Sequence, residues 1–146
     1  MRSLKSVFAV AIAVSTLLFL VTPAKAQEPR YLHALSNLHA ARGWLNADRR
    51  PEFKDARRDA LLEIDAAINE VAAAAHDEGK STASTPPPDW GGDPALPVHN
   101  AVHLLDDAYA DVRYGTDIPK DAGLQARAVA RIGKAREIAN RIAHAH

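Results

Sequence analysis

The sequence predicts an all-α protein, a four-helix bundle made of two antiparallel helical hairpins joined by a linker rich in Pro and Gly. The first observation is an amphipathic pattern over residues 55–75, where apolar residues recur at helical spacing: Leu61, Ile64, Ile68, Val71 and Ala75. The second is that three further segments carry the same periodicity. The third is that Pro and Gly crowd into residues 80–97, between the second and third segments. An amphipathic helix is not stable alone in water, so the four helices are expected to cover one another's apolar stripes.

Residues 1–26 are expected to be a signal peptide. Arg2 and Lys5 precede an apolar run over residues 7–21, and Ala24 and Ala26 form an Ala-x-Ala cleavage site. A membrane anchor is the alternative, but the run is short for a membrane span. The sequence therefore predicts a periplasmic or secreted protein whose mature part, residues 27–146, is a single domain.

Charge and composition narrow the function. The chain has 18 Lys and Arg and 18 Asp and Glu, and removing the three basic residues of the signal peptide leaves 15 against 18, a net charge of −3. A mildly acidic domain is a poor nucleic-acid binder, and no membrane span is expected after cleavage. Because Cys is absent, disulfides, covalent c-type haem, iron–sulfur clusters and a thiol nucleophile are excluded.

The first hairpin is expected over residues 29–79. Its first helix is predicted at 30–46, with Pro29 in the first turn, and its second opens at Pro51 and ends at Gly79, which suits a helix C-terminus. Leu61 and Ile64 are predicted to be buried, together with Leu105 and Ile132 of the second hairpin.

Four polar side chains of the first hairpin carry expectations of their own. Arg42 lies near the apolar stripe and is expected to extend to solvent or pair with an acid. His39, near the edge of the stripe, is expected to be partly buried and bonded to a carboxylate, with a metal ligand as the alternative. Glu63 is read as part of the polar face of its helix, and His33 as lying opposite the core beside Trp44.

The linker, residues 80–97, is too dense in Pro and Gly for a regular helix or strand. It is interpreted as a crossover between the hairpins, partly extended, with Trp90 able to pin it onto the bundle. Few backbone hydrogen bonds are expected to hold it, so residues 81–97 should be the first site of proteolysis.

The second hairpin is expected over residues 98–146, with helices at 98–114 and 122–143. A basic face on the last helix could meet acids of neighbouring helices: Arg127, Arg131, Lys134 and Arg141. The hairpins also resemble each other, because a shift of 67 positions places Leu38 on Leu105, and a shift of 71 places Val71 on Ile142. A coincidence of heptad spacing explains the same match.

A divalent-metal site is the sharpest chemical hypothesis. His99 and His103 are four residues apart and Asp106 is one turn further, so all three are expected on one helix face. Imidazole and carboxylate suit Cu(II), Ni(II) or Zn(II). The alternative is an ordinary polar surface. His144 and His146 form a tail that binds such ions weakly in any context.

Catalytic motifs are missing from the sequence. There is no Gly-x-Ser-x-Gly, no His-Glu-x-x-His, no phosphate-binding Gly-rich loop and no Glu-x-x-His of the di-iron bundles. We therefore expect an exported, non-enzymatic protein that acts by binding, through its helical surface or its Trp90 loop, to an envelope partner. Metal binding through surface histidines is the alternative function.

Four blocks of sequence resemble a family of small secreted bacterial helical proteins without an established activity. The blocks are Tyr31–Leu38, Glu63–Ile68, Asp77–Lys80 followed by Pro86–Pro88, and His103–Ala108. This resemblance implies the helical fold and export. The segment His99–Ala108 also resembles, more faintly, small periplasmic metal-binding four-helix bundle proteins, which are richer in His.

Overall fold

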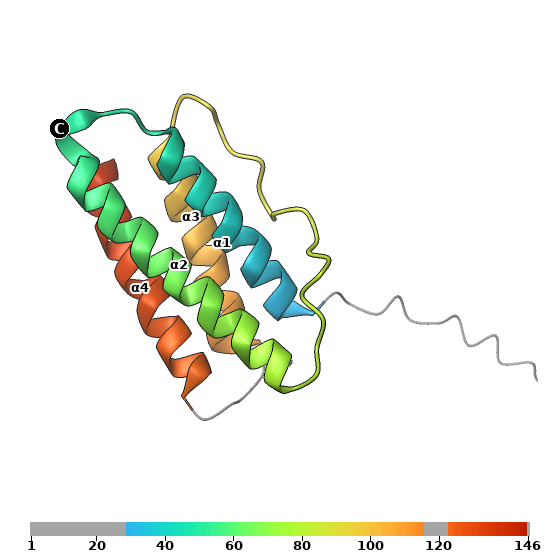
Figure 1. Cartoon of the computed structure of the whole chain (residues 1–146). Coiled ribbons are helices and arrows are strands. Elements are labelled where there is room, and N and C mark those ends of the chain that lie inside the picture. Colours follow the sequence, from blue (N-terminus) through green and yellow to red (C-terminus); the bar gives the residue numbers. More distant parts are fainter. Residues whose placement is uncertain (1–28, 116–122, 146) are drawn as a thin grey trace, which may run out of the picture.

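A computed structural model describes residues 29–115 and 123–145 and confirms the all-α four-helix bundle. The helices are α1 (Arg30–Ala47), α2 (Lys54–Asp77), α3 (Pro97–Tyr114) and α4 (Leu124–Ala143), and a short 3-10 helix, η1 (Pro51–Phe53), precedes α2 (Figure 1). The expected signal peptide, the turn around Pro119 and His146 lie outside the described residues.

Neighbouring helices are antiparallel throughout the bundle. α1 packs against α2 and α3, and α4 packs against α2 and α3 (Figure 1). Because α2 and α3 run in the same direction, the chain must return along the whole bundle to connect them. The long linker is that return, and it passes along α1.

The end of α2 follows the sequence expectation closely. Gly79 has a φ of 68°, the left-handed conformation that favours glycine. The Gly79 amide donates to the His76 carbonyl, and the Lys80 amide donates to the Ala75 carbonyl, both at 2.8 Å. This pair of bonds is a Schellman motif, which stops the helix and turns the chain toward α1.

The core is built from small and branched aliphatic side chains of all four helices. Its largest fully buried apolar members are Leu38, Leu45, Ile64, Leu104, Leu105, Ile132, Ile142, Val98 and Val112. The predicted burial of Ile64, Leu105 and Ile132 is therefore confirmed. Alanines at 34, 41, 101 and 108 are also fully buried, and such small residues let helices approach closely.

The core face of α2 differs from the prediction. Leu61, expected to be buried, is only half-buried, whereas Glu63, expected on the polar face, is 8% exposed. Glu63 is buried because α4 supplies two cations: Arg131 Nη1 lies 3.0 Å and Lys134 Nζ 2.8 Å from its carboxylate oxygens. These pairs satisfy a carboxylate that would otherwise be costly to bury.

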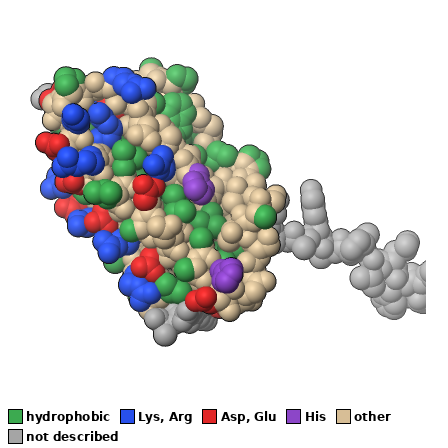
Figure 2. All heavy atoms as spheres, viewed as in Figure 1, with side chains coloured by type: hydrophobic (Ala, Val, Ile, Leu, Met, Phe, Trp, Pro, Cys, Tyr) green, Lys and Arg blue, Asp and Glu red, His purple; other side chains and the backbone are tan. Residues whose placement is uncertain are grey.

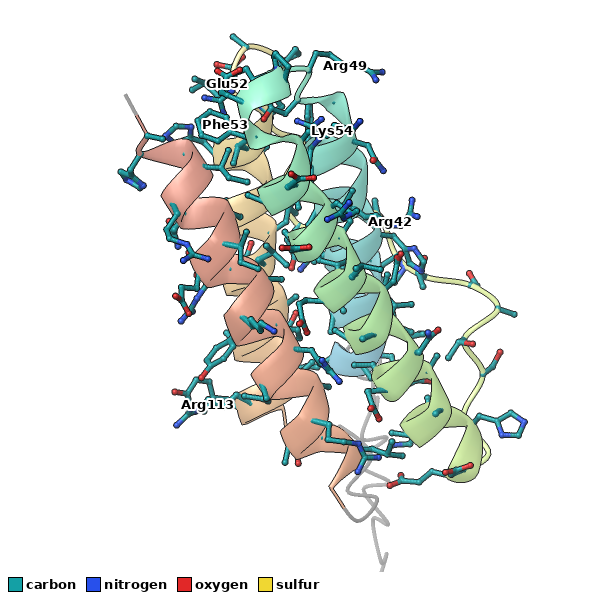
Figure 3. The ribbon with its side chains drawn as sticks, turned by 60° about the vertical axis from the view of Figure 1, so that its left-hand side comes forward. Arg42, Arg49, Glu52, Phe53, Lys54 and Arg113 are labelled. Atoms are coloured by element: carbon teal, nitrogen blue, oxygen red, sulfur yellow. The ribbon has the colours of Figure 1, made fainter. Side chains whose placement is uncertain are left out.

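Two expectations about basic side chains are confirmed and one about histidine is wrong. Arg42 pairs with Asp65 of α2 at 2.7 Å on the surface (Figure 3). The basic face of α4 meets acids of α2, because Arg127 also pairs with Glu70 at 3.0 Å. His39 is exposed rather than partly buried, because it lies outside the set of buried residues on α1.

None of the helices in the described part of the chain is long and apolar enough to cross a membrane.

Candidate functional site

The linker is held along α1, and we call residues 80–96 the strap. Two hydroxyls of α1 hold its first half. Tyr31 Oη donates to the Ser81 carbonyl at 3.0 Å, and Ser36 Oγ donates to the Pro86 carbonyl at 2.6 Å. Pro86 has no backbone amide to donate, so its carbonyl is the backbone group of this residue that a helix side chain can hold.

Asn37 holds the middle of the strap at Asp89. The Asn37 amide donates to Asp89 Oδ2 at 2.7 Å and its oxygen accepts from the Asp89 backbone amide at 3.0 Å. The other carboxylate oxygen of Asp89 lies 3.3 Å from His33 Nδ1. His33, expected opposite the core, is thus half-buried under the strap. Asn37 is fully buried, so its two bonds with Asp89 satisfy an amide that cannot reach water.

Asn100 of α3 holds the end of the strap at Asp93. Its oxygen accepts from the Asp93 amide at 2.9 Å, and its nitrogen donates to the Asp93 carbonyl at 2.5 Å. Just before, Gly92 has a φ of 81° and passes so close to α1 that a Cβ atom there would lie 2.8 Å from Trp44. Only glycine fits this position without strain.

Trp90 packs on the bundle as the sequence suggested. Its ring lies 4.7 Å from the His103 ring, centre to centre, and His103 Nδ1 lies 3.1 Å from Asp107 Oδ2. Burial raises the pKa of Asp107, and the nearby His103 partly opposes that rise. Burial likewise raises the pKa of Asp111, which Arg30 opposes through a 3.0 Å hydrogen bond. Partly buried acids of α3 therefore lie against α1 and the strap.

The outer side of the strap is exposed and carries no charge between Ser81 and Pro88. Its exposed residues include Thr85, Pro87 and Pro88, and Trp90 is 36% exposed although one face packs on His103. Figure 2 shows the contrast: Lys, Arg, Asp and Glu crowd over the side of α2 and α4, and few of them lie on the side where the strap runs.

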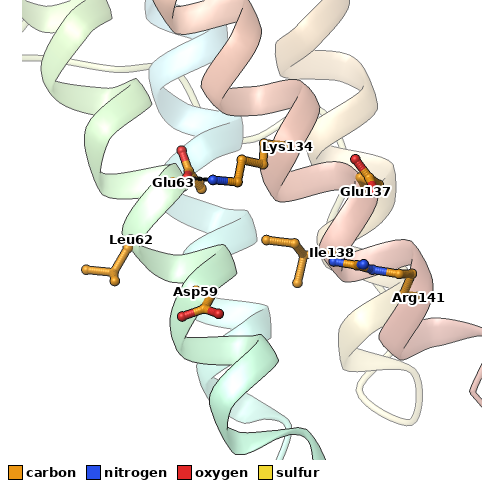
Figure 4. A pocket seen from close by; sticks show the side chains of 7 residues that line it. All are labelled: Asp59, Leu62, Glu63, Lys134, Glu137, Ile138 and Arg141. Carbon is orange, nitrogen blue, oxygen red and sulfur yellow. Dashed lines mark ion pairs between the residues drawn. The ribbon is translucent and has the colours of Figure 1, made fainter.

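A second candidate surface is a hollow of about 320 Å³ between α2 and α4. Figure 4 shows Glu63 facing Lys134 across it, with Asp59 and Leu62 on α2 and Arg141 on α4. Leu62 is 61% exposed. The hydrogen bond from Lys134 lowers the pKa of Glu63, so this carboxylate is ionised and already paired. The buried carboxylate that lines this hollow is therefore already balanced by cations of α4.

The predicted metal-site residues have separate neighbours in the structure. His99 lies near His144, the residue that follows α4, with ring centres 6.1 Å apart. His103 lies between Trp90 and Asp107, and Asp106 pairs with Arg136 of α4 at 3.1 Å. Within residues 29–115 and 123–145, no three His, Asp or Glu side chains are arranged so that they could hold a metal ion together.

Sequence reasoning missed the anchors of the strap. A signal was present, because Ser36, Asn37 and Asn100 are polar residues directly beside core positions of amphipathic helices. Buried polar side chains need partners, and the nearby linker contains unpaired backbone groups.

Comparison of the chain with protein-family models, curated proteins and solved structures found no match. The resemblance to small secreted helical proteins thus stays a prediction.

Proposed function

We propose that this protein is an exported, non-enzymatic binding protein whose recognition surface is the strap. The partner we propose is an envelope protein with an aromatic-lined groove for an extended, Pro-rich segment. One observation carries the proposal: side chains of α1 and α3 hold the strap from its inner side, while Pro87, Pro88 and Trp90 remain exposed on its outer side.

The sequence of the strap supports an extended shape. Proline fixes its own φ and forces the residue before it into extended conformations, so Thr85, Pro86 and Pro87 are all restricted. Such segments bind aromatic-lined grooves because little conformational entropy remains to be lost. The anchors at Pro86 and Asp89 reduce that loss further, since they fix the segment on both sides of Pro87 and Pro88.

Trp90 adds a suitable contact for a partner. Aromatic side chains dominate the energetics of many protein interfaces, and Trp is enriched among residues whose truncation costs most. The contact with His103 holds the ring in place, and the exposed part of the ring lies on the same segment as Pro87 and Pro88. The expected signal peptide supports an envelope location for this partner.

Site-specific photo-crosslinking in cells of the source organism tests the proposal. A photoreactive residue is placed at Pro87 on the strap or, as the matched control, at the exposed Glu137 on α4. We expect a discrete protein adduct from position 87 alone, and we expect it to disappear when Pro88→Ala and Trp90→Ala are added. Equal adducts from both positions, or an adduct that survives these substitutions, would overturn the strap as the recognition surface.

A further inference from the structure

We infer that His99 and His144 bind a divalent transition metal ion, with Cu(II) preferred, at the end of the bundle where α3 begins and α4 ends. Their ring centres are 6.1 Å apart and the rings are tilted by 52°. This site is separate from the proposed binding surface of the strap, and either can fail without the other.

The spacing of the two rings suits a shared metal ion. A metal bonded at about 2.0–2.1 Å to one nitrogen of each imidazole lies roughly 3 Å from each ring centre, so the two centres lie about 5–6 Å apart. The 6.1 Å separation needs only a small side-chain adjustment to reach this range. Both residues are exposed, so such an adjustment displaces no packed neighbour of the core.

A backbone contact prepares His144 as a ligand. Its Nδ1 lies 2.8 Å from the carbonyl oxygen of Asn140, which can only accept, so in neutral His144 Nδ1 carries the proton. The proton-free Nε2 is then the nitrogen that has a lone pair available for a metal ion. Metal-binding histidines are commonly held in one tautomer by a hydrogen bond of this kind, which fixes the ring and raises its basicity.

The surroundings of the pair leave room for water as further ligands. Two imidazoles supply part of a coordination sphere, and exposure lets water complete it. Asp48 and Arg50 line a hollow beside His99. Because Asp48 is bonded to Arg50 at 3.0 Å, we do not include its carboxylate among the ligands. Imidazole nitrogens bind Cu(II) more tightly than Ni(II) or Zn(II), which sets the order of affinity.

The pair differs from the trio expected from the sequence. His103 lies next to His99 by helical spacing, but its Nδ1 faces Asp107 and its ring packs on Trp90. Asp106 faces Arg136. Of the three predicted residues, His99 alone lies within ring-contact distance of another imidazole among the described residues.

The test is titration of the tag-free mature protein with Cu(II), followed by calorimetry and by electron paramagnetic resonance. All chains carry His146→Ala, so that the C-terminal His-x-His is broken. His99→Ala and His144→Ala are the test variants. His103→Ala and His76→Ala are the controls, because His76 is exposed at the end of α2. Zn(II) is titrated in parallel.

We expect one Cu(II) per chain with two nitrogen ligands in the resonance spectrum. Each test variant should weaken binding by at least about tenfold, the lower range for loss of an outer partner of a metal ligand, and the double variant should be little worse than either single one. Both controls should bind like the parent. An equal loss of Cu(II) affinity in His103→Ala would support the predicted site of His99, His103 and Asp106 instead. Cu(II) binding that survives His99→Ala would show that the C-terminal tail binds the ion without His99. Either result overturns the pair.

Discussion

Single buried polar residues decide where the strap runs. Asn37 and Asn100 are fully buried amides that hold strap residues through both their oxygen and their nitrogen. A buried amide left without partners costs about 1–3 kcal/mol, so these residues favour the one path that satisfies them. Glycine is necessary at position 92 for a steric reason, because its φ is 81° and an added Cβ would lie 2.8 Å from Trp44 and 2.9 Å from Asn100.

Gly92→Ala should destabilise the protein, whereas Gly91→Ala should not. At position 92 an added Cβ meets Trp44 at 2.8 Å and the φ of 81° disfavours any side chain, while nothing lies within 4 Å of a Cβ at position 91. We expect a loss of at least about 1–2 kcal/mol at position 92, the cost of the left-handed conformation alone, and a change within about 0.5 kcal/mol at position 91. Urea denaturation measures both. Equal effects would mean that the strap does not pack on α1 here.

Glu63→Gln should lower stability at pH 7, and the loss should shrink in acid. Hydrogen bonds from Lys134 and Arg131 hold the pKa of Glu63 below its ordinary value of 4.5, although burial opposes them. A depressed pKa contributes stability that is present above the unfolded value and is lost as the pH falls through the folded value. The difference in melting temperature between the parent and Glu63→Gln should therefore narrow below about pH 4.5. Thermal melts at a series of pH values measure this difference.

Asp111→Asn should change the pH dependence of stability in the opposite direction to Glu63→Gln. Burial raises the pKa of Asp111 above its ordinary value of 3.8. The stability that protonated Asp111 contributes to the fold is therefore present below pH 3.8, and it is lost as the pH rises through the raised pKa of the folded state. Relative to Asp111→Asn, the parent should lose stability with rising pH. The same trend in both variants would contradict the assignment of these two environments.

At the scale of elements, α2 shows which features of a helix its hydrophobic periodicity can predict and which it cannot. The amphipathic stripe predicted the helix and the burial of Ile64, because helical periodicity alone gives the middle of the stripe. It misplaced Leu61 and Glu63, because which flank of a stripe is covered depends on the neighbouring helix. Cations at positions 131 and 134 of α4 make the Glu63 flank the better one to bury.

A matched pair of substitutions, Ile64→Ala and Leu61→Ala, tests which flank of α2 is buried in the core. Ile64→Ala should cost about 2–5 kcal/mol, since Ile64 is fully buried and a cavity remains. Leu61→Ala should cost less, about 1–2 kcal/mol, because Leu61 is only partly buried against the core. Guanidinium unfolding of the two variants compares them directly. A larger loss for Leu61→Ala would place the core of α2 on the other flank.

The strap should be cut by chymotrypsin after Trp90, and Asn37→Ala should speed that cut several-fold. The variant loses two hydrogen bonds to Asp89, the residue before Trp90. Asn69→Ala is the matched control, because Asn69 is exposed on α2. Trypsin is unsuitable, since residues 81–97 contain no Lys or Arg. First cleavage inside α2, or equal rates in both variants, would contradict the anchoring.

At the scale of the whole molecule, the sequence predicts the fold class better than the arrangement. Four amphipathic segments and one Pro-rich linker lead to a bundle, because each stripe must be covered. The pairing of His99 with His144 and the anchoring of Asp89 by Asn37 join residues far apart in the chain. Local periodicity carries no information about such contacts, which arise only when the direction of every helix is known.

The direction of the helices makes the length of the linker a structural requirement. The 18-residue α3 is about 27 Å long at 1.5 Å per residue, and the linker must return over that distance because α2 and α3 run in the same direction. A four-residue Gly-Ser loop in place of residues 78–96 spans at most roughly 18 Å and cannot make this return. We expect the shortened chain to form a larger assembly by exchange of hairpins, or to lose its cooperative melt.

A Gly-Ser linker of the original length is the control, and it should keep the mass and the helical circular dichroism spectrum of the parent. It should melt at a lower temperature, because the bonds of Asn37 and Asn100 with the strap are gone. Light scattering after size exclusion, with thermal melts, separates these outcomes. If the four-residue chain kept the parent's mass and melted as cooperatively at the same temperature, α2 and α3 could not run in the same direction.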